Sequence, residues 1–155
     1  YFGAKLPHLV WHTSDLPAHH RGIEAWLSEA DLSNVRPPLA LDVNQDVWGI
    51  EAVDGLFSAN TMHIFSWQSI TGMFAGAGRV LTSAGRLAVY GPFNFEGQYT
   101  SESNAQFDRF LRSRDPLGGI RDFESLDKLA GRQGLSLRAN YSMPSNNQIL
   151  VWERG

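Results

Sequence analysis

Residues 135–152 read LSLRANYSMPSNNQILVW, and this stretch near the end of the chain decides the fold. Two β-prone runs, Leu135–Tyr141 and Gln148–Trp152, are separated only by the turn-forming residues SMPSNN. A parallel pair of strands needs a crossover of roughly a dozen or more residues, so these two runs are expected to pair as an antiparallel hairpin. The chain therefore ends in a hairpin and not in another strand–helix–strand unit.

Upstream of the hairpin, short apolar strands alternate with amphipathic helices. The predicted strands are Leu9–Thr13, Leu39–Leu41, Gly55–Ala59 and Leu87–Tyr90. Four helices are predicted. The first begins near Pro17, and the second runs from Trp67 to Leu81 with Gly85 as its C-terminal cap. The third includes Phe107–Leu111, and the fourth runs from the cap residue Asp122 to Gly134. Because parallel neighbours need a crossover helix, this alternation predicts a parallel sheet covered by helices.

Polar residues follow several of these strands, and the carboxyl ends of parallel strands share the edge at which ligands bind. Asp15, Asp42, Asn60 and the loop at 91–97 are expected on this edge. In nucleotide-binding Rossmann-like folds, an acid after the second strand lies roughly 20 residues beyond a glycine-rich turn and binds the ribose. Counted back from Asp15, that turn falls before Tyr1, so we expect the N-terminal strand and its glycine-rich loop to be missing from this stretch.

The acid at Asp15 suits a nicotinamide-dependent enzyme as well as a methyltransferase, and the C-terminal hairpin favours the methyltransferase. We predict an α/β, Rossmann-like class I fold of the S-adenosylmethionine-dependent methyltransferases. Its sheet is mostly parallel, with a C-terminal antiparallel hairpin. On this prediction residues 1–155 form one N-terminally incomplete domain.

Composition excludes several other classes of protein. The formal net charge is −3 and no run of lysine and arginine stands out, so nucleic acid is not an expected partner. The chain has no cysteine, and the adjacent His19 and His20 would point about 100° apart on a helix, so no metal site is predicted. No apolar run approaches the ~20 residues that span a bilayer, which makes a cytoplasmic protein the simplest interpretation.

Specific sequence segments point to a family. They are PHL at 7–9 with SDL at 14–16, NVRPPLALDV at 34–43, MHI at 62–64, YGPF at 90–93, SNAQFD at 103–108, RDP at 114–116, GIRD at 119–122 and MPSNN at 143–147. On these segments, across nearly its whole length, the chain resembles the methyltransferase-like 26 family. This is an uncharacterised group of class I methyltransferase-like proteins with the domain of unknown function 938. The resemblance implies S-adenosylmethionine as cofactor and methyl transfer to an unidentified, small acceptor.

Five residues are candidates for binding this cofactor. Asp15, followed by Leu16, would accept hydrogen bonds from the two ribose hydroxyls, although an aspartate before a proline also caps helices. Asp42 and Val43 resemble the pair that contacts adenine; the alternative is a polar strand end without a ligand. Asn60 follows the strand beside which the methionine end of the cofactor is usually bound.

A second set of residues is assigned to the methyl acceptor. His63 is a candidate general base because the pKa of histidine lies near neutrality, although a lone histidine more often packs as a structural residue. Tyr90 is a weaker catalytic candidate. The predicted substrate-side residues are Phe93, Asn104, Asp108, Arg112, Arg121, Asn146 and Asn147. Individually, these polar side chains also suit a solvated helix face or a turn.

Two other functions stay open. One is a methyltransferase-like scaffold that does not catalyse and binds a protein partner; without the first strand its neighbours would be exposed edges, which invite a homodimer. The other is a nicotinamide-dependent oxidoreductase, which the acid at Asp15 allows and the final hairpin disfavours.

Overall fold

The computed structural model describes all of residues 1–155. Contacts within the chain divide it into two compact units, Tyr1–Gly49 and Ile50–Gly155, which we call unit 1 and unit 2 and describe separately. Both contain parallel strands joined by a helix, so the chain has the α/β class predicted from the sequence. That residues 1–155 form a single domain stays a prediction.

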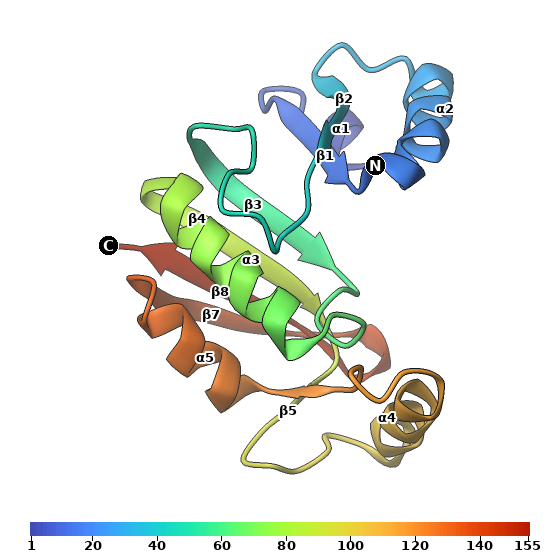
Figure 1. Ribbon diagram of the computed structural model, residues 1–155, viewed down its shortest axis with the longest axis vertical. Coiled ribbons are helices and arrows are strands. Elements are labelled where there is room, and N and C mark those ends of the chain that lie inside the picture. The colour runs from blue at the N-terminus through green and yellow to red at the C-terminus, as the bar shows by residue number, and fades with distance from the viewer. The chain divides into compact units, whose positions relative to one another are not determined.

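Unit 1 is built on one parallel pair of strands (Figure 1). Its elements are α1 (Phe2–Lys5), β1 (Trp11–Asp15), the 3-10 turn Pro17–His19, α2 (His20–Ala30) and β2 (Val35–Ala40). Trp11 lies opposite Val35 and Asp15 opposite Ala40. The predicted strands Leu9–Thr13 and Leu39–Leu41 overlap β1 and β2, but their bounds differ because main-chain pairing, rather than the apolar run, sets where a strand begins and ends.

Asn34, directly before β2, forms side-chain hydrogen bonds to the first residues of unit 1. Its side-chain amide nitrogen donates to the carbonyl oxygens of Gly3 at 3.0 Å, Leu6 at 3.3 Å and Leu9 at 3.0 Å. A Cβ on Gly3 would lie 2.5 Å from the Val35 side chain, so α1 approaches β2 at a point where only glycine fits. The two amide hydrogens of Asn34 are thus shared among three carbonyl groups of residues 3–9.

Unit 2 contains a four-stranded sheet in the order β3-β4-β8-β7 and a short parallel pair, β5 with β6. Its elements are β3 (Val53–Ala59), α3 (Trp67–Val80), β4 (Leu81–Gly91), β5 (Phe93–Asn94), α4 (Glu102–Arg114), β6 (Arg121–Asp122), α5 (Phe123–Gly131), β7 (Leu135–Met143), the 3-10 turn Pro144–Asn146 and β8 (Asn147–Arg154). β3 and β4 are parallel, whereas β8 is antiparallel to β4 and to β7. The predicted C-terminal hairpin is confirmed.

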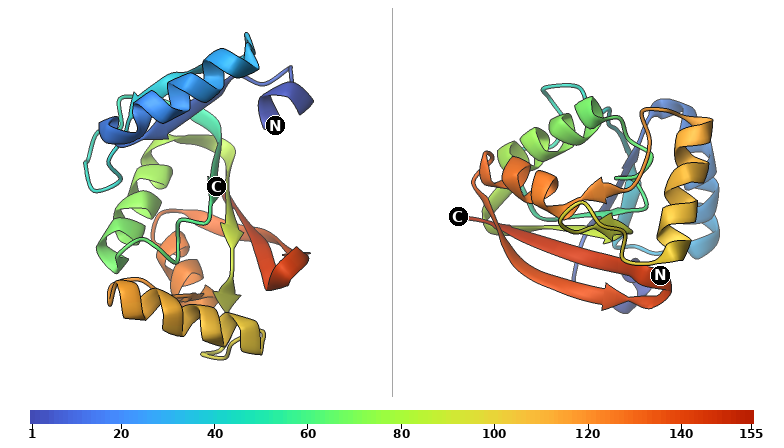
Figure 2. Two further views of the ribbon diagram at one scale, coloured as in Figure 1. Left: turned by 90° about the vertical axis from the view of Figure 1, so that its right-hand side faces the viewer. Right: turned by 90° about the horizontal axis from the view of Figure 1, so that it is seen from below.

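Helices α3 and α5 lie on one face of this sheet (Figures 1 and 2). Trp152 of β8 is fully buried between them and the sheet. Its ring packs edge-on against Phe74 of α3, with the centroids 5.5 Å apart, and its indole N–H donates to Asp127 of α5 at 2.9 Å. Leu87 and Leu150, at 0% exposure, continue the same core along the central strands.

The ends of two predicted helices differ from expectation. α3 ends at Val80 and Leu81 is its cap, so Gly85 does not close the helix and lies inside β4. A Cβ on Gly85 would be 2.7 Å from the carbonyl oxygen of Thr82, which shows that this glycine serves a tight bend in the strand. Asp122 is the N-cap position of α5, as predicted, but its carboxylate accepts from the Gly97 N–H instead of capping; α5 ends at Gly131, before Gly134.

No helix of the chain combines the length and the apolar character that crossing a membrane requires. The cytoplasmic location inferred from the sequence stays a prediction.

Candidate functional site

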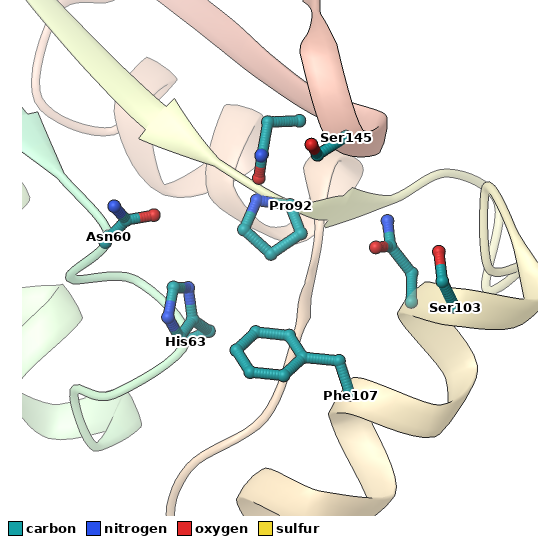
Figure 3. A pocket seen from close by; sticks show the side chains of 8 residues that line it. Asn60, His63, Pro92, Ser103, Phe107 and Ser145 are labelled. Atoms are coloured by element: carbon teal, nitrogen blue, oxygen red, sulfur yellow. The ribbon is translucent and has the colours of Figure 1, made fainter.

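Unit 2 contains a cavity of about 420 Å³ (Figure 3). Its lining residues are Asn60, His63, Pro92, Ser103, Asn104, Phe107, Ser145 and Asn147. Ala59 of β3 lies opposite Tyr90 of β4, so Asn60 and Pro92 follow two neighbouring parallel strands at the same edge of the sheet. This is the edge at which α/β proteins bind ligands.

His63 lies in the loop between β3 and α3 and forms one wall of the cavity. It is 6% exposed, its Nδ1 atom has no hydrogen-bond partner, and its ring packs edge-on against Phe107 of α4 at 5.3 Å. Burial, and then the positive charge of Arg121, lower the pKa of His63 below its usual value near 6.5. At neutral pH its imidazole is therefore uncharged, with a lone pair available for a proton.

Asn60 adopts the left-handed backbone conformation, with φ of 58°. Its backbone N–H donates to the carbonyl oxygen of Tyr90 at 2.9 Å, and the hydroxyl groups of Ser58 and Thr61 bond to each other beside it. Asparagine tolerates this conformation better than most residues. The turn directs the chain from β3 into the segment that carries His63.

The opposite wall of the cavity joins the start of α4 to the turn between β7 and β8 (Figure 3). Ser101 caps α4 by accepting from the Asn104 N–H at 3.1 Å. The Asn104 side chain donates to the Asn146 carbonyl oxygen at 3.2 Å, and the Asn146 side chain donates to the Ser103 hydroxyl at 3.2 Å. Ser145 and Asn146 have φ of 60° and 59°, so this turn is a strained segment held by α4.

Three of the predicted substrate-side residues form a cluster beside the cavity but do not line it. Asp108 is 2% exposed and accepts from the Tyr99 hydroxyl at 2.8 Å, the Arg112 Nε at 2.8 Å and the Ile120 N–H at 2.6 Å. Arg121 donates to backbone carbonyl groups only. Each of these three charged side chains thus forms hydrogen bonds to other groups of the protein.

The structure brings together some of the predicted site residues. His63, Asn60, Asn104 and Asn147 meet around the cavity. Tyr90, Phe93, Asp108, Arg112, Arg121 and Asn146 are not among its lining residues. Four lining residues were not predicted from the sequence: Pro92, Ser103, Phe107 and Ser145. Pro92 belongs to the loop at 91–97 that was expected at the ligand edge, whereas Phe107 had the apolar spacing of an ordinary core residue.

Unit 1 holds the two predicted cofactor carboxylates at the ends of neighbouring parallel strands. The Leu41 N–H donates to the Asp15 carbonyl oxygen at 3.0 Å, which joins the strand ends. Asp15 Oδ1 accepts from the Leu16 N–H at 2.7 Å and from His19 Nδ1 at 2.8 Å. Asp42 Oδ1 accepts from the backbone and side chain of Asn44, both at 2.9 Å. The second oxygen of each carboxylate has no hydrogen bond within the protein.

Asp15 is a charged acceptor at neutral pH. Burial raises its pKa, but the hydrogen bonds from His19 and Leu16 outweigh burial and hold the pKa below its usual value. Leu16 is 44% exposed beside it, and Val43, next to Asp42, is half-buried. No three histidine, aspartate or glutamate side chains lie close enough together to hold a metal ion.

The fold of the chain is similar to that of solved S-adenosylmethionine-dependent methyltransferases. It is similar to an O-methyltransferase family protein from Burkholderia thailandensis, with a TM-score of 0.85 and 16% identity over 99% of this chain and 46% of that chain. It is also similar to the S-adenosylmethionine-dependent methyltransferase SibL in its apo form, with a TM-score of 0.82 and 18% identity over 98% and 45% of the two chains.

A third similar structure is LepI in complex with S-adenosylhomocysteine and a substrate analogue, with a TM-score of 0.80 and 17% identity over 99% of this chain and 39% of that chain. The chain thus spans less than half the length of these structures, and at such identities the likeness shows the fold alone. The family profile described as "Protein of unknown function (DUF938)" matches residues 1–154, and the chain belongs to this family. The more specific assignment to the methyltransferase-like 26 family stays a prediction.

Proposed function

We propose that this chain is the part of an S-adenosylmethionine-dependent methyltransferase that transfers a methyl group to a small, uncharged acceptor. One observation carries the proposal. A buried, uncharged histidine with an unpartnered ring nitrogen lines a cavity at the carboxyl ends of parallel strands. The fold in which this cavity lies is similar to that of S-adenosylmethionine-dependent methyltransferases.

The carboxylates of unit 1 suit the nucleoside end of the cofactor. Asp15 and Asp42 each have one oxygen without a hydrogen bond, and carboxylates accept from ribose hydroxyls or from the exocyclic amine of adenine. Leu16 and Val43 would contribute apolar contacts next to them. S-adenosylmethionine, when bound, supplies an electrophilic methyl group on sulfur.

The cavity of unit 2 suits an acceptor without charge. Every polar residue that lines it is a neutral amide, hydroxyl or imidazole, and Phe107 and Pro92 supply flat apolar walls. A charged acceptor would find no opposite charge there, because Asp108, Arg112 and Arg121 all have partners within the protein. Asn104 and Asn147 would orient the acceptor through its polar groups.

His63 would act as the general base. Its imidazole would take the proton from the acceptor hydroxyl, and the acceptor oxygen would receive the methyl group that the bound cofactor supplies from its sulfur. The imidazolium then releases the proton to water, and the acceptor leaves as a methyl ether. Asn104 and Asn147 would contribute to the remaining rate enhancement by holding the acceptor in one orientation. Tyr90 does not line the cavity, so His63 is the base that we favour.

Isothermal titration of the full-length protein with S-adenosylmethionine, S-adenosylhomocysteine and NAD tests the cofactor. We expect both sulfur compounds to bind and NAD not to bind. Asp15→Ala should weaken binding by about tenfold to a hundredfold because it removes a charged hydrogen-bond acceptor. Glu29→Ala, an exposed acid on α2, is the matched control and should bind normally. Binding of NAD alone would indicate an oxidoreductase, and binding of neither class of cofactor would indicate a scaffold.

The base is tested by following S-adenosylhomocysteine formation with a panel of small phenols and alcohols and their carboxylated analogues. We expect turnover of the uncharged compounds, with an acid limb whose midpoint lies below about 6.5, since His63 must be unprotonated. His63→Gln should lower the rate by about a hundredfold or more. Equal turnover of the carboxylated analogues would contradict the uncharged acceptor.

A further inference from the structure

The short turn that carries His63 is held from outside by a single segment. The turn is closed by hydrogen bonds from the Ile64 and Phe65 N–H groups to the Thr61 carbonyl oxygen, at 3.0 and 2.9 Å. Three of its own carbonyl groups, those of residues 62, 63 and 65, accept hydrogen bonds from residues 119–121. Those residues lie more than fifty positions further along the chain.

Arg121 makes most of these contacts. Its Nε donates to the Met62 carbonyl oxygen at 3.1 Å, and its Nη2 donates to the Phe65 carbonyl oxygen at 2.5 Å and the Leu117 carbonyl oxygen at 2.6 Å. No carboxylate forms a salt bridge with it. The planar guanidinium therefore acts as a clamp on backbone oxygens, which its fixed fork of donors suits.

The segment that presents Arg121 is itself fixed. Arg121 lies in β6 and pairs with Phe93 of β5, and the Ile120 N–H donates to the buried carboxylate of Asp108. The Gly119 N–H donates to the His63 carbonyl oxygen at 2.9 Å. Gly119 has φ of 129°, and a Cβ there would lie 2.6 Å from the Arg112 guanidinium, so only glycine fits at this position.

We propose that Arg121 is a positioning residue, whose guanidinium clamps the 62–65 turn so that the imidazole of His63 faces the cavity. The proposal rests on the proposed function only in taking His63 as the base. It also assigns a supporting role to Asp108, which fixes the segment that carries the clamp. Neither side chain needs to contact the acceptor.

The clamp has an electrostatic consequence. The groups that face His63 are the Phe107 ring of α4, the backbone of Gly91 in β4 and the charge of Arg121 in β6. Phe107 and Gly91 bring no charge, so Arg121 adds to burial in disfavouring the imidazolium. Arg121 thus both orients the ring and keeps it free to accept a proton.

The test is an NMR titration of the histidine rings in the full-length protein without cofactor, with His63→Gln used to assign the resonance. In Arg121→Met we expect the pKa of His63 to rise toward about 6.5, because the repelling charge is gone. We also expect the amide of Gly119 to exchange about tenfold faster or more. Arg112→Met is the matched control: it breaks a salt bridge to Asp108 but should leave the pKa of His63 unchanged.

Arg121→Lys keeps the charge but replaces the fork with a single ammonium group. We expect it to leave the pKa of His63 low and still to speed exchange at Gly119 by about tenfold, which separates clamping from charge. This variant also serves if Arg121→Met does not fold. Exchange and pKa equal to the wild type in both folded variants would overturn the proposal. Because the titration uses no cofactor, failure of the proposed function would appear separately, in the calorimetry.

Discussion

The two units differ in how they are held together. Unit 2 has a dense apolar core, with Phe74, Leu87, Leu150 and Trp152 at 0% exposure. In unit 1 no residue of α2 is buried, and the unit depends on the pairing of β1 with β2 and on the three hydrogen bonds of Asn34. The cavity residues thus lie beside a dense apolar core, whereas the carboxylates proposed for the nucleoside lie on a unit with few buried apolar side chains.

The largest effect is expected in the core of unit 2. Trp152→Ala should lower the free energy of unfolding by about 3–5 kcal/mol, because it removes the ring that packs between α3, α5 and the sheet. Denaturant unfolding followed by circular dichroism measures this. Tyr141→Ala, an exposed aromatic on β7, is the control, and its effect should be far smaller. A loss below about 1 kcal/mol would show that Trp152 is not central to the core.

A smaller effect is expected at the buried carboxylate beside the cavity. Asp108→Asn should cost about 2 kcal/mol, because three donors lose a charged acceptor. Burial raises the pKa of Asp108, but the hydrogen bonds from Arg112, Tyr99 and the Ile120 N–H outweigh it and lower the pKa. The wild type should thus keep this stability above about pH 4 and lose it as the pH falls through the lowered pKa. Equal acid sensitivity in wild type and variant would contradict this.

In unit 1 the contribution of polar contacts to stability is tested by removing a single side chain, that of Asn34. Asn34→Ala should destabilise by about 1–2 kcal/mol, because three carbonyl groups lose their donor. Hydrogen exchange should accelerate at the Trp11 and Leu9 amides of unit 1 and stay unchanged at the sheet amides of unit 2. Acceleration in both units alike would show that the two units do not unfold independently.

The smallest effect is expected for an ion pair on the surface of α4. Arg109 and Glu102 are both well exposed, and Arg109→Ala should change the free energy of unfolding by less than about 0.5 kcal/mol. It is a useful contrast with Arg112→Met on the same helix, whose partner Asp108 is buried. A loss in Arg109→Ala as large as in Arg112→Met would mean that burial of the carboxylate is not what matters.

Much of the fold was predictable because its signals are local. The hairpin of β7 and β8 followed from a connection too short for a crossover, and α3 followed from the apolar period of residues 70–81. Strand ends were less accurate. β4 begins at Leu81, directly after α3, and it contains a bend at Ala84 and Gly85. No apolar pattern in the sequence indicates this bend.

The site was predictable in part for a related reason. Residues directly after parallel strands, such as Asn60 and Asp15, could be placed at the ligand edge from their position alone. For the side chains of α4, the sequence did not indicate which line the cavity and which are buried within the protein. The sequence predicted Asp108 for the substrate side and Phe107 for an apolar helix face, but Phe107 lines the cavity and Asp108 is buried against the 119–121 segment.

The α/β class, the C-terminal hairpin and the residues that follow each strand could be predicted from the amino-acid order, because they depend on periodicity and connection length. Which charged side chains face the cavity, and which form hydrogen bonds within the protein, depends on contacts between distant segments. Arg112 donates a hydrogen bond to Asp108, four residues earlier in the sequence, and Arg121 donates one to the Met62 carbonyl oxygen, 59 residues earlier. Only folding in three dimensions brings Arg121 to the Met62 carbonyl group, whereas Asp108 and Arg112 have the i,i+4 spacing of neighbours on one helix.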